Sequence, residues 1–421
     1  MHRTRMVYPS VSLYLQARFY PASWQNITTA KAAPVAKVER PVIVHTRVTA
    51  MKRYENLYPK LCSMDNLQFA HQCAKRGKGW YRDVQMVESN PEYYLKQLQD
   101  MLVNHTYLTS PYVKFEKKER GKVREIYKLP YYPDRIGQWA GVNVIEPYLI
   151  RSMVSTTYSA IPGRGIHAAL HDVQKAMENR DECEYCLKLD VRHYYQSIDH
   201  DVLKALYRHL FKDPELLWWI DEIIDSISTG EQEGVGIPIG NFMSQYSGNY
   251  YLTPFDHWIK EEKRVKHYFR YMDDIVIFGP DKQQLHTLFD EIRTKLHDEL
   301  HLKVKDNWQI FPTYVRGLDF VGYRIFDGYT LLRKSTCEDM KKRLARISVK
   351  TQRGQLMNYS DWCAINSYKG WLKHCDSYRL YQKYITPLEA DADRYYREVV
   401  LKKGREKHEK LGNDIQQSEA G

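Results

Sequence analysis

Residues 265–279 read VKHYFRYMDDIVIFG, and this stretch decides the fold. Apolar, β-favouring residues stand on both sides of Asp273 and Asp274, and no helical period fits them. The pattern predicts a β-hairpin with two carboxylates at its tip. Two adjacent carboxylates at an otherwise hydrophobic turn are costly unless a positive charge lies beside them, and a divalent metal ion is the usual partner.

A third carboxylate comes from an upstream segment. Residues 185–191 (YCLKLDV) have the pattern of a short buried strand that carries Asp190 near its end, and residues 200–210 then read as a helix. Mg²⁺ prefers octahedral oxygen ligands, and two ions about 3.5–4 Å apart can clamp the attacking and leaving oxygens of a nucleotidyl transfer. We therefore expect Asp190, Asp273 and Asp274 to be catalytic and to hold two Mg²⁺ ions, which Mn²⁺ could replace. The alternative is a helix cap and a plain acidic turn.

Four motifs occur in a fixed order along the chain, at residues 190–199, 236–245 (GIPIGNFMSQ), 271–274 and 319–323 (DFVGY). With them the chain resembles reverse transcriptases of the palm–fingers–thumb type, over about residues 51–385. The resemblance implies an α+β fold, namely a right-handed polymerase fold with fingers, a palm of antiparallel sheet over helices, and a helical thumb.

Five parts are expected along the chain: a basic, disordered extension at 1–50, fingers at 51–185, palm at 186–330, helical thumb at 331–395 and a polar tail at 396–421. Residues 1–50 hold seven Lys and Arg against one Glu, so +6 of the net charge of +11 lies there. This segment could be a transit peptide, a nucleic-acid-binding arm, or an extension upstream of a true start at Met51. The last is favoured, because the resemblance begins at Met51.

The second motif departs from the usual family pattern. Most members read Gln-Gly-x-x-x-Ser-Pro, whereas this chain has Ile239 before Gly240 and Gln245 after the serine. This form is similar to the reverse transcriptases of diversity-generating retroelements, a prokaryotic group within the group II intron-like superfamily. In those systems a template-repeat RNA is copied with errors at adenines, and the cDNA replaces a variable repeat in a target gene. Residues 54–81 and 366–379 resemble the same subgroup.

The departure also has a physical consequence. In the family, the glutamine at the position of Ile239 lies against the incoming nucleotide and helps to hold it for correct pairing. Isoleucine cannot form that hydrogen bond, so discrimination would depend on shape, which separates close analogues in an apolar pocket by only about 1–3 kcal/mol. The sequence therefore predicts low copying fidelity.

Other nucleotide-site residues are implied by matching positions. Tyr195 stands where the family has its sugar-discriminating aromatic residue, although it could be an ordinary core residue. Residues 114–128 alternate around Gly121 and read as a hairpin, similar to the fingers hairpin of the family. The full nucleotide-binding set is Arg124 and Lys128 for the triphosphate, backbone groups at His193 and Tyr194, Tyr195 for the sugar, and Ile239, Gly240 and Gln245 for the pairing pocket; Val191 joins Asp190 at the metals. Either basic residue could instead be a solvated strand charge.

Two further groups of residues are expected to contact nucleic acid. The resemblance implies a primer grip at Phe320, Gly322 and Tyr323. A basic cluster on the predicted thumb could follow the phosphate backbone or only solvate a helix face; its members are Lys341, Lys342, Arg343 and Arg346. Asn307 takes the place of a family lysine that can protonate pyrophosphate, with Lys305 as one possible substitute.

Composition agrees with a globular protein, since 43% of the 421 residues are apolar. The seven cysteines are expected to be reduced, and no apolar run reaches the length of a membrane span. The expected partners are template RNA, the cDNA/RNA hybrid, deoxynucleoside triphosphates and, by resemblance, a small basic helical accessory protein, in the cytoplasm of a prokaryote or encoded by a phage. The alternatives are an antiviral or group II intron reverse transcriptase, or a non-catalytic RNA-binding protein on the same fold.

Overall fold

The computed structural model describes residues 53–119 and 122–401. The expected extension at 1–50 and most of the expected tail lie outside these residues. The described chain forms two compact units, which are treated separately below. The larger comprises residues 53–119, 122–169 and 180–311, and the smaller comprises residues 170–179 and 312–401.

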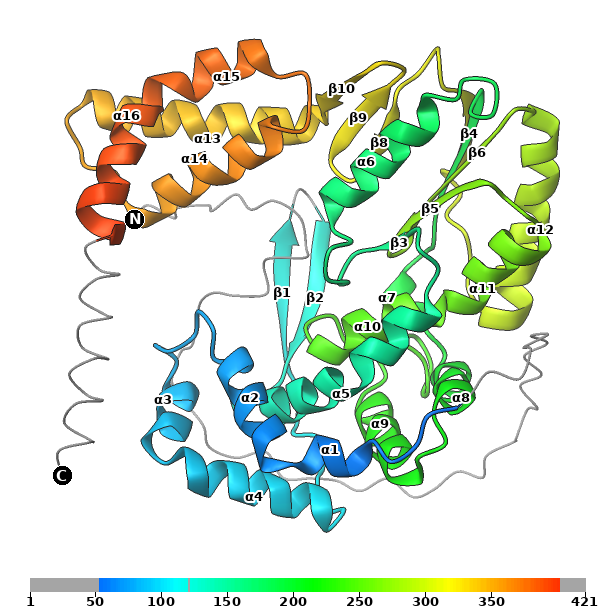
Figure 1. Cartoon of the computed structure of the whole chain (residues 1–421), viewed down its shortest axis with the longest axis vertical. Coiled ribbons are helices and arrows are strands. Elements are labelled where there is room, and N and C mark those ends of the chain that lie inside the picture. Colours follow the sequence, from blue (N-terminus) through cyan, green and yellow to red (C-terminus); the bar gives the residue numbers. More distant parts are fainter. Residues whose placement is uncertain (1–52, 120–121, 402–421) are drawn as a thin grey trace. The chain divides into compact units, whose positions relative to one another are not determined.

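The first part of the larger unit is helical and carries one β-hairpin (Figure 1). Ser63 and Asn90 cap two of its helices by accepting backbone N–H groups of the first turn. The elements are α1 (Tyr58–Cys62), α2 (Met64–Ala74), α3 (Arg82–Ser89), α4 (Pro91–Val103), β1 (Val113–Glu119), β2 (Lys122–Lys128), η1 (Tyr131–Arg135) and α5 (Ile136–Ser152).

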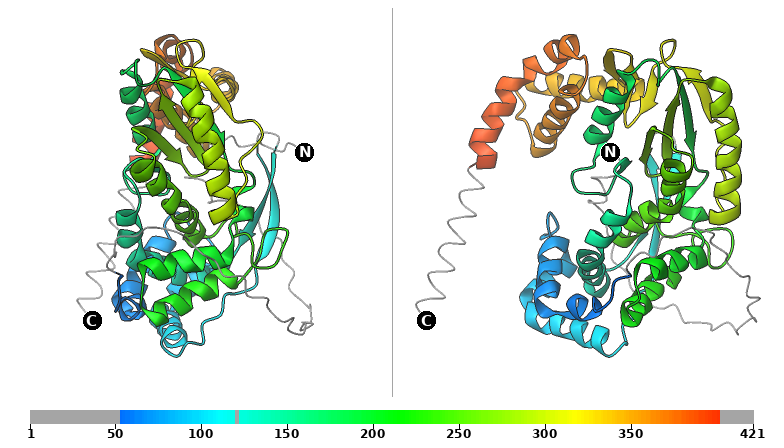
Figure 2. Two further views of the ribbon diagram at one scale, coloured as in Figure 1. Left: turned by 90° about the vertical axis from the view of Figure 1, so that its right-hand side faces the viewer. Right: turned by 45° about the vertical axis from the view of Figure 1, so that its right-hand side comes forward.

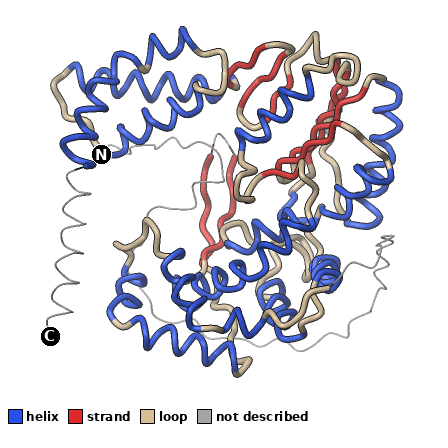
Figure 3. Tube along the Cα trace, in the orientation of Figure 1, coloured by secondary structure: helices blue, strands red, loops and turns tan. Residues whose placement is uncertain are grey.

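The second part of the larger unit is built around a five-stranded sheet in the order β3-β5-β6-β4-β7, drawn in red in Figure 3. Its strands are β3 (Thr157–Tyr158), β4 (Tyr185–Asp190), β5 (His267–Tyr271), β6 (Asp274–Gly279) and β7 (Gln309–Pro312). The helices are α7 (Tyr194–Ser197), α8 (His200–Leu210), α9 (Pro214–Asp225), α10 (Phe242–Tyr251), α11 (Thr253–His257), η2 (Trp258–Glu262) and α12 (Lys282–Leu300). Helix α12 packs on β4 and β6, and α10 packs on α5 and α8.

The smaller unit combines a three-stranded antiparallel sheet with helices that follow it in the chain (Figure 2). The last residues of α6 (Ile166–Met177) belong to it, and Gln174 donates a hydrogen bond of 2.8 Å to Thr330 on its sheet. Its other elements are β8 (Leu318–Phe320), β9 (Tyr323–Phe326), β10 (Tyr329–Leu332), α13 (Lys334–Gln352), α14 (Tyr359–Leu372), α15 (Tyr378–Tyr384), α16 (Thr386–Tyr395) and η3 (Tyr396–Val400).

The expected α+β architecture is confirmed, and so are its local elements. The hairpin at 265–279, the helix at 200–210 and the hairpin at 114–128 all form. All seven cysteines are free thiols. No helix of the described ranges has both the length and the apolar character that a membrane crossing requires. The division by contacts groups residues 312–330 with the helices that follow, and the proposed limits of fingers, palm and thumb stay predictions.

Candidate active site

Three carboxylates meet at one end of the central sheet. Strands β4 and β6 are antiparallel, and their register sets Asp190 directly opposite Asp274. Strands β5 and β6 form the hairpin in which Tyr271 faces Asp274, so that Met272 and Asp273 make the turn. Because the three residues lie on two paired strands and the turn between strands, the fold brings together the acidic groups that the sequence singled out.

Negative charge is concentrated at this point. Burial, together with the charge of Asp190, raises the pKa of Asp273 to about 7. Lys305 donates a hydrogen bond of 2.6 Å to Asp190, and the Lys188 ammonium lies 3.4 Å from an oxygen of Asp274. Within residues 53–119 and 122–401, no group of three or more His, Cys, Asp or Glu side chains is arranged to hold a metal ion. The oxygen donors and the surplus negative charge nevertheless suit a hard divalent cation.

Lys305 reaches the site through tertiary pairing. The backbone N–H of Lys305 donates to the carbonyl of Asp190 (2.9 Å), and that of Arg192 donates to the carbonyl of Lys303 (2.7 Å). This short ladder lays the segment after α12 alongside the residue that ends β4. The sequence offered Lys305 only as one possible substitute for a missing lysine; the structure places its ammonium on a candidate catalytic carboxylate.

A buried ion pair stabilises the acidic turn through a hydrogen bond to its backbone. Arg270 and Asp256 are both fully buried, with bonds of 2.7 and 2.5 Å between guanidinium and carboxylate. Arg270 also donates to the carbonyl of Met272 (3.0 Å) and to the carbonyl of Asn249 (3.0 Å). Met272 has φ of 55°, in the left-handed region that non-glycine residues rarely adopt. The hydrogen bond from Arg270 to the Met272 carbonyl therefore helps to stabilise a turn whose backbone conformation is unfavourable. The only sequence signal for this role was an arginine inside an apolar strand.

Tyr195 lies beside the acidic turn, as its predicted role requires. Its hydroxyl donates to the Met272 sulfur at 3.9 Å, and a Cβ placed on Gly248 would meet its ring at 3.5 Å. Burial and then the Asp273 charge raise the pKa of Tyr195, whereas the Arg124 charge opposes that shift. The charge of Arg124 on β2 therefore acts on the Tyr195 hydroxyl. Whether Tyr195 screens the sugar stays a prediction.

The neighbours of Tyr195 differ from it in exposure. Tyr194 is 3% exposed, and its hydroxyl donates to the carbonyl of Gly248. Its side chain is thus a core residue, and only its backbone remains available for the expected triphosphate contact. His193 is exposed and has φ of 45°, at the start of the short helix α7.

Backbone contacts fix the motif at 236–245 in place. The N–H of Tyr127 on β2 donates to the carbonyl of Ile239 (2.8 Å). Gly240 has φ of +132°, and a Cβ there would collide with the carbonyl oxygen of Tyr127, so only glycine fits. Gln138 of α5 accepts the N–H groups of Phe242 (3.1 Å) and the next residue (3.4 Å), in place of a side-chain cap on α10. No sequence pattern indicated this role for Gln138. Gln245, in the first turns of α10, is partly buried.

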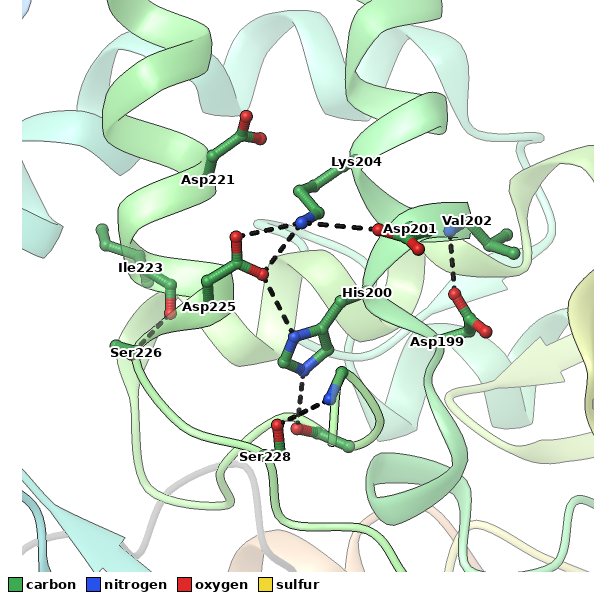
Figure 4. A network of polar contacts seen from close by, with 12 residues as sticks. Asp199, His200, Asp201, Val202, Lys204, Asp221, Ile223, Asp225, Ser226 and Ser228 are labelled. Carbon is green, nitrogen blue, oxygen red and sulfur yellow. Dashed lines mark hydrogen bonds and ion pairs between the residues drawn. The ribbon is translucent and has the colours of Figure 1, made fainter. Parts of the chain in front are cut away.

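A polar network on α8 and α9 anchors the start of the same motif (Figure 4). His200 lies between two acceptors, with Nε2 donating to the carbonyl of Gly236 (3.0 Å) and Nδ1 3.4 Å from Asp225. Lys204 binds both oxygens of Asp225 at 2.9 Å. Asp199 caps α8 by accepting an N–H of the first turn. These contacts tie the helix after Asp190 to the loop that carries Ile239.

In the smaller unit, the expected primer-grip residues form a tight turn between β8 and β9. Phe320 and Tyr323 are fully buried, and the Tyr323 hydroxyl donates to the carbonyl of Trp371 at 3.0 Å. Gly322 has φ of +88°, and a Cβ there would collide with the Trp371 ring. The side chains of Phe320 and Tyr323 are therefore core groups, and any primer contact would fall to the turn backbone.

The expected basic cluster on α13 contains one residue with a partner inside the smaller unit and others that are exposed. Arg343 and Lys350 both bind Asp361, at 2.9 and 2.6 Å, and the Asp361 side chain is only 6% exposed. Arg343 thus stabilises the packing of α13 on α14, which its prediction as a backbone-binding residue did not foresee. Lys342 and Arg346 are exposed, and Lys341 is partly exposed.

One family model matches the part of the chain that carries the three aspartates. The sequence profile of a family described as "Reverse transcriptase (RNA-dependent DNA polymerase)" matches residues 115–325, half of the chain. A telomerase from Candida albicans in complex with a fragment of telomeric RNA is similar at 12% identity and a TM-score of 0.42, over 68% of this chain and 61% of that chain. An apo telomerase from Candida tropicalis, truncated from its C-terminal domain, is similar at 12% identity and a TM-score of 0.41. The similarity covers 54% of this chain and 57% of that chain. No curated protein sequence matches.

Proposed function

Because the chain belongs to the reverse transcriptase family, the RNA-dependent DNA polymerases, we propose that it is the mutagenic polymerase of a diversity-generating retroelement. In this role it copies a template-repeat RNA into error-prone cDNA, which then replaces a variable repeat in a target gene. The meeting of Asp190, Asp273 and Asp274 supports the polymerase activity. Ile239 and Gln245 in the second motif support the retroelement type.

Reverse transcriptases use divalent metal ions, and we assign the ligands to the three aspartates, with the backbone at Val191. Mg²⁺ is the ion we propose, with Mn²⁺ as a substitute; when bound, it supplies charge neutralisation and orientation of the reacting oxygens. The protein keeps its carboxylates in position through the paired strands β4 and β6. The buried Arg270–Asp256 pair holds the turn, and Lys305 offers a cation beside Asp190.

The nucleotide is held on the side of Tyr195 and the β1–β2 hairpin. Arg124 and Lys128 bind the triphosphate, together with backbone groups at His193 and Tyr194. The flat ring of Tyr195 excludes a ribose 2′-OH, which selects deoxynucleotides. The position of Tyr195 between Met272 and Gly248 supports this role, since that contact fixes its ring beside the acidic turn.

Low fidelity follows from Ile239. Its backbone is fixed by the hydrogen bond to Tyr127 and by the close approach at Gly240. A change of this side chain to glutamine should therefore alter the pocket without displacing the loop. The variant Ile239→Gln isolates the missing hydrogen-bonding group from every other difference between this protein and accurate relatives.

The test is Mg²⁺-dependent primer extension on an RNA template, followed by sequencing of the cDNA. The wild type should extend with errors concentrated opposite template adenines, and Ile239→Gln should lower that error rate. Asp273→Ala/Asp274→Ala should abolish extension while the protein remains folded. An unchanged error spectrum in Ile239→Gln refutes the role of Ile239. Accurate wild-type extension indicates an antiviral or group II intron type, and no extension at all, even with accessory protein and RNA supplied, indicates an RNA-binding protein.

The resemblance also supports the remaining parts of the proposal. The partners are template RNA, the cDNA/RNA hybrid and a small basic helical accessory protein, in a prokaryotic cytoplasm or from a phage genome. Paired template and variable repeats beside the gene would support this setting.

A further inference from the structure

Gln138 caps a helix to which it does not belong. It lies in the first turn of α5 and is 2% exposed. Its side-chain oxygen accepts the N–H groups of Phe242 (3.1 Å) and Met243 (3.4 Å). These residues begin α10, which packs on α5. The first N–H groups of a helix have no partner within it, so an acceptor from α5 supplies the cap.

The residue that precedes α10 does not cap it. Asparagine is a residue type that often caps helices, yet the Asn241 side chain accepts none of the first N–H groups of α10. Its amide instead donates to the Tyr112 hydroxyl at 2.8 Å, and Asn241 is 4% exposed. Because the Asn241 side chain is turned to another partner, the start of α10 depends on Gln138.

The same short segment carries Ile239, whose side chain is partly exposed. On one side, the carbonyl of Ile239 accepts the N–H of Tyr127 (2.8 Å). On the other side, Gln138 holds the backbone of Phe242, and the Trp139 ring stacks on the Phe242 ring with centroids 4.1 Å apart. The backbone that positions Ile239 is therefore anchored at both ends, by β2 and by α5.

Only the oxygen of the Gln138 amide is used. The nitrogen, Nε2, is buried and has no hydrogen-bond partner among the residues that the structure describes. A buried amide nitrogen without a partner is costly, so an apolar residue would pack at this position at lower cost. The oxygen is therefore the group that the position requires. An apolar side chain of the same length would remove its two hydrogen bonds, whereas a carboxyl group would keep an acceptor.

We propose that Gln138 is a positioning residue for the pairing pocket. By holding the first turn of α10 it fixes the backbone of Ile239, and thereby the fit of the incoming base. Its loss lets the segment relax, which weakens binding of the correct nucleotide and reduces the shape-based discrimination against a mismatched one. The inference rests on the proposed placement of Ile239 against the nucleotide, and it adds a buried residue of α5 that acts through the backbone.

The test is primer extension by the full-length protein on an RNA template with single deoxynucleotides, which gives kcat and KM for the correct and for a mismatched nucleotide. Gln138→Met keeps the length of the side chain but removes the acceptor. It should raise KM for the correct nucleotide about fivefold, in line with the usual effect of a lost helix N-cap. KM for the mismatched nucleotide should change less, so the error frequency should rise. Gln138→Glu retains an acceptor oxygen in either protonation state and should keep both KM values near those of the wild type.

A matched control separates positioning from stability. Asn90 caps α4 in the same unit by accepting the N–H of Tyr93 (3.3 Å). Asn90→Ala should lower the melting temperature much as Gln138→Met does, but it should leave KM for both nucleotides unchanged. A purely structural role of Gln138 would give this same pattern in Gln138→Met, namely a lower melting temperature and fewer active molecules at unaltered KM.

Two results would overturn the proposal. One is wild-type KM for both nucleotides in Gln138→Met, or in Gln138→Asn, which withdraws the oxygen by one carbon atom and takes the place of the methionine variant if that does not fold. The other is an equal rise in KM for both nucleotides, because the pocket then loses affinity but no discrimination. Failure of the pocket assignment gives a different result: if Ile239 does not face the nucleotide, Ile239→Gln leaves the error spectrum unchanged. If only the role of Gln138 is wrong, Ile239→Gln changes the spectrum and Gln138→Met does not.

Discussion

The variant Asp256→Asn should destabilise the larger unit strongly. Asp256 and Arg270 are both fully buried, and the substitution preserves size while it leaves the guanidinium without its counter-charge. Burial by itself would lower the pKa of Arg270, but the Asp256 charge outweighs burial and the pKa is raised, so Arg270 stays ionised. Removal of one partner from a buried pair costs about 3–5 kcal/mol. That is a large part of the ~5–15 kcal/mol by which domains are stable.

The assay is urea unfolding followed by circular dichroism, with primer extension on the same samples. Asp100→Asn is the matched control, since the Lys96–Asp100 pair has side chains 61% and 53% exposed. That change should cost less than about 1 kcal/mol. A loss below about 1 kcal/mol for Asp256→Asn would refute the reasoning, because it would mean that Arg270 finds another partner or water.

A double variant separates stability from positioning. Arg270→Met/Asp256→Leu replaces the pair with apolar side chains, which should recover part of the lost stability. It cannot restore the donor on the carbonyl of Met272, so primer extension should stay impaired. Recovery of both properties together would contradict the positioning role of Arg270.

Three other predictions address the loop, the helix network and the metals. Gly240→Ala should lower the melting temperature and the extension rate, because φ of +132° and a collision with a carbonyl on β2 both oppose a Cβ. Gly165→Ala is the control and should change neither property, since a Cβ placed on Gly165 meets nothing within 4 Å. Burial raises the pKa of Asp225, but hydrogen bonds from a histidine and a lysine outweigh it and lower the pKa to about 2, from an ordinary 3.8. The ionised Asp225 therefore stabilises the fold fully above its ordinary pKa, and this stabilisation is lost as the pH falls through about 2. Asp225→Asn should be less stable than the wild type at pH 7, by under about 1 kcal/mol because the group is half-exposed. In thermal melts the difference should vanish near pH 2. Chelation of divalent ions should abolish extension. Mg²⁺ at ten times its Kd should stabilise the wild type by about 1.4 kcal/mol but should not stabilise Asp273→Asn/Asp274→Asn. Equal thermal shifts in the two proteins would argue against these residues as metal ligands.

Local elements of this protein could be predicted from the sequence because the information in them is local. The apolar, β-favouring residues on both sides of Asp273 and Asp274 predict a hairpin with these two residues at its tip. The strand that ends at Asp190 and the helix at 200–210 follow from the same kind of pattern. Gly240 and Gly322 stood in recognised motifs, and the structure gives the reason, since neither position has room for a Cβ.

Exposure of individual side chains could not be predicted in this way. The resemblance placed Phe320 and Tyr323 in a primer-gripping turn, and the structure shows that both side chains are buried in the smaller unit. Arg343 was expected to face a phosphate backbone, yet it binds Asp361. A motif specifies where the backbone turns, but the packing of other segments decides which side chains remain exposed.

Only the tertiary structure could show the partners of the charged and polar groups. Lys305 meets Asp190 across 115 positions of sequence, and Gln138 meets Phe242 across 104. Sequence periodicity reports the conformation of neighbouring residues, whereas the energy of a buried charge depends on whatever the fold brings within a few ångströms of it. The amino-acid sequence therefore determined the acidic turn, and tertiary packing determined the charges that surround it.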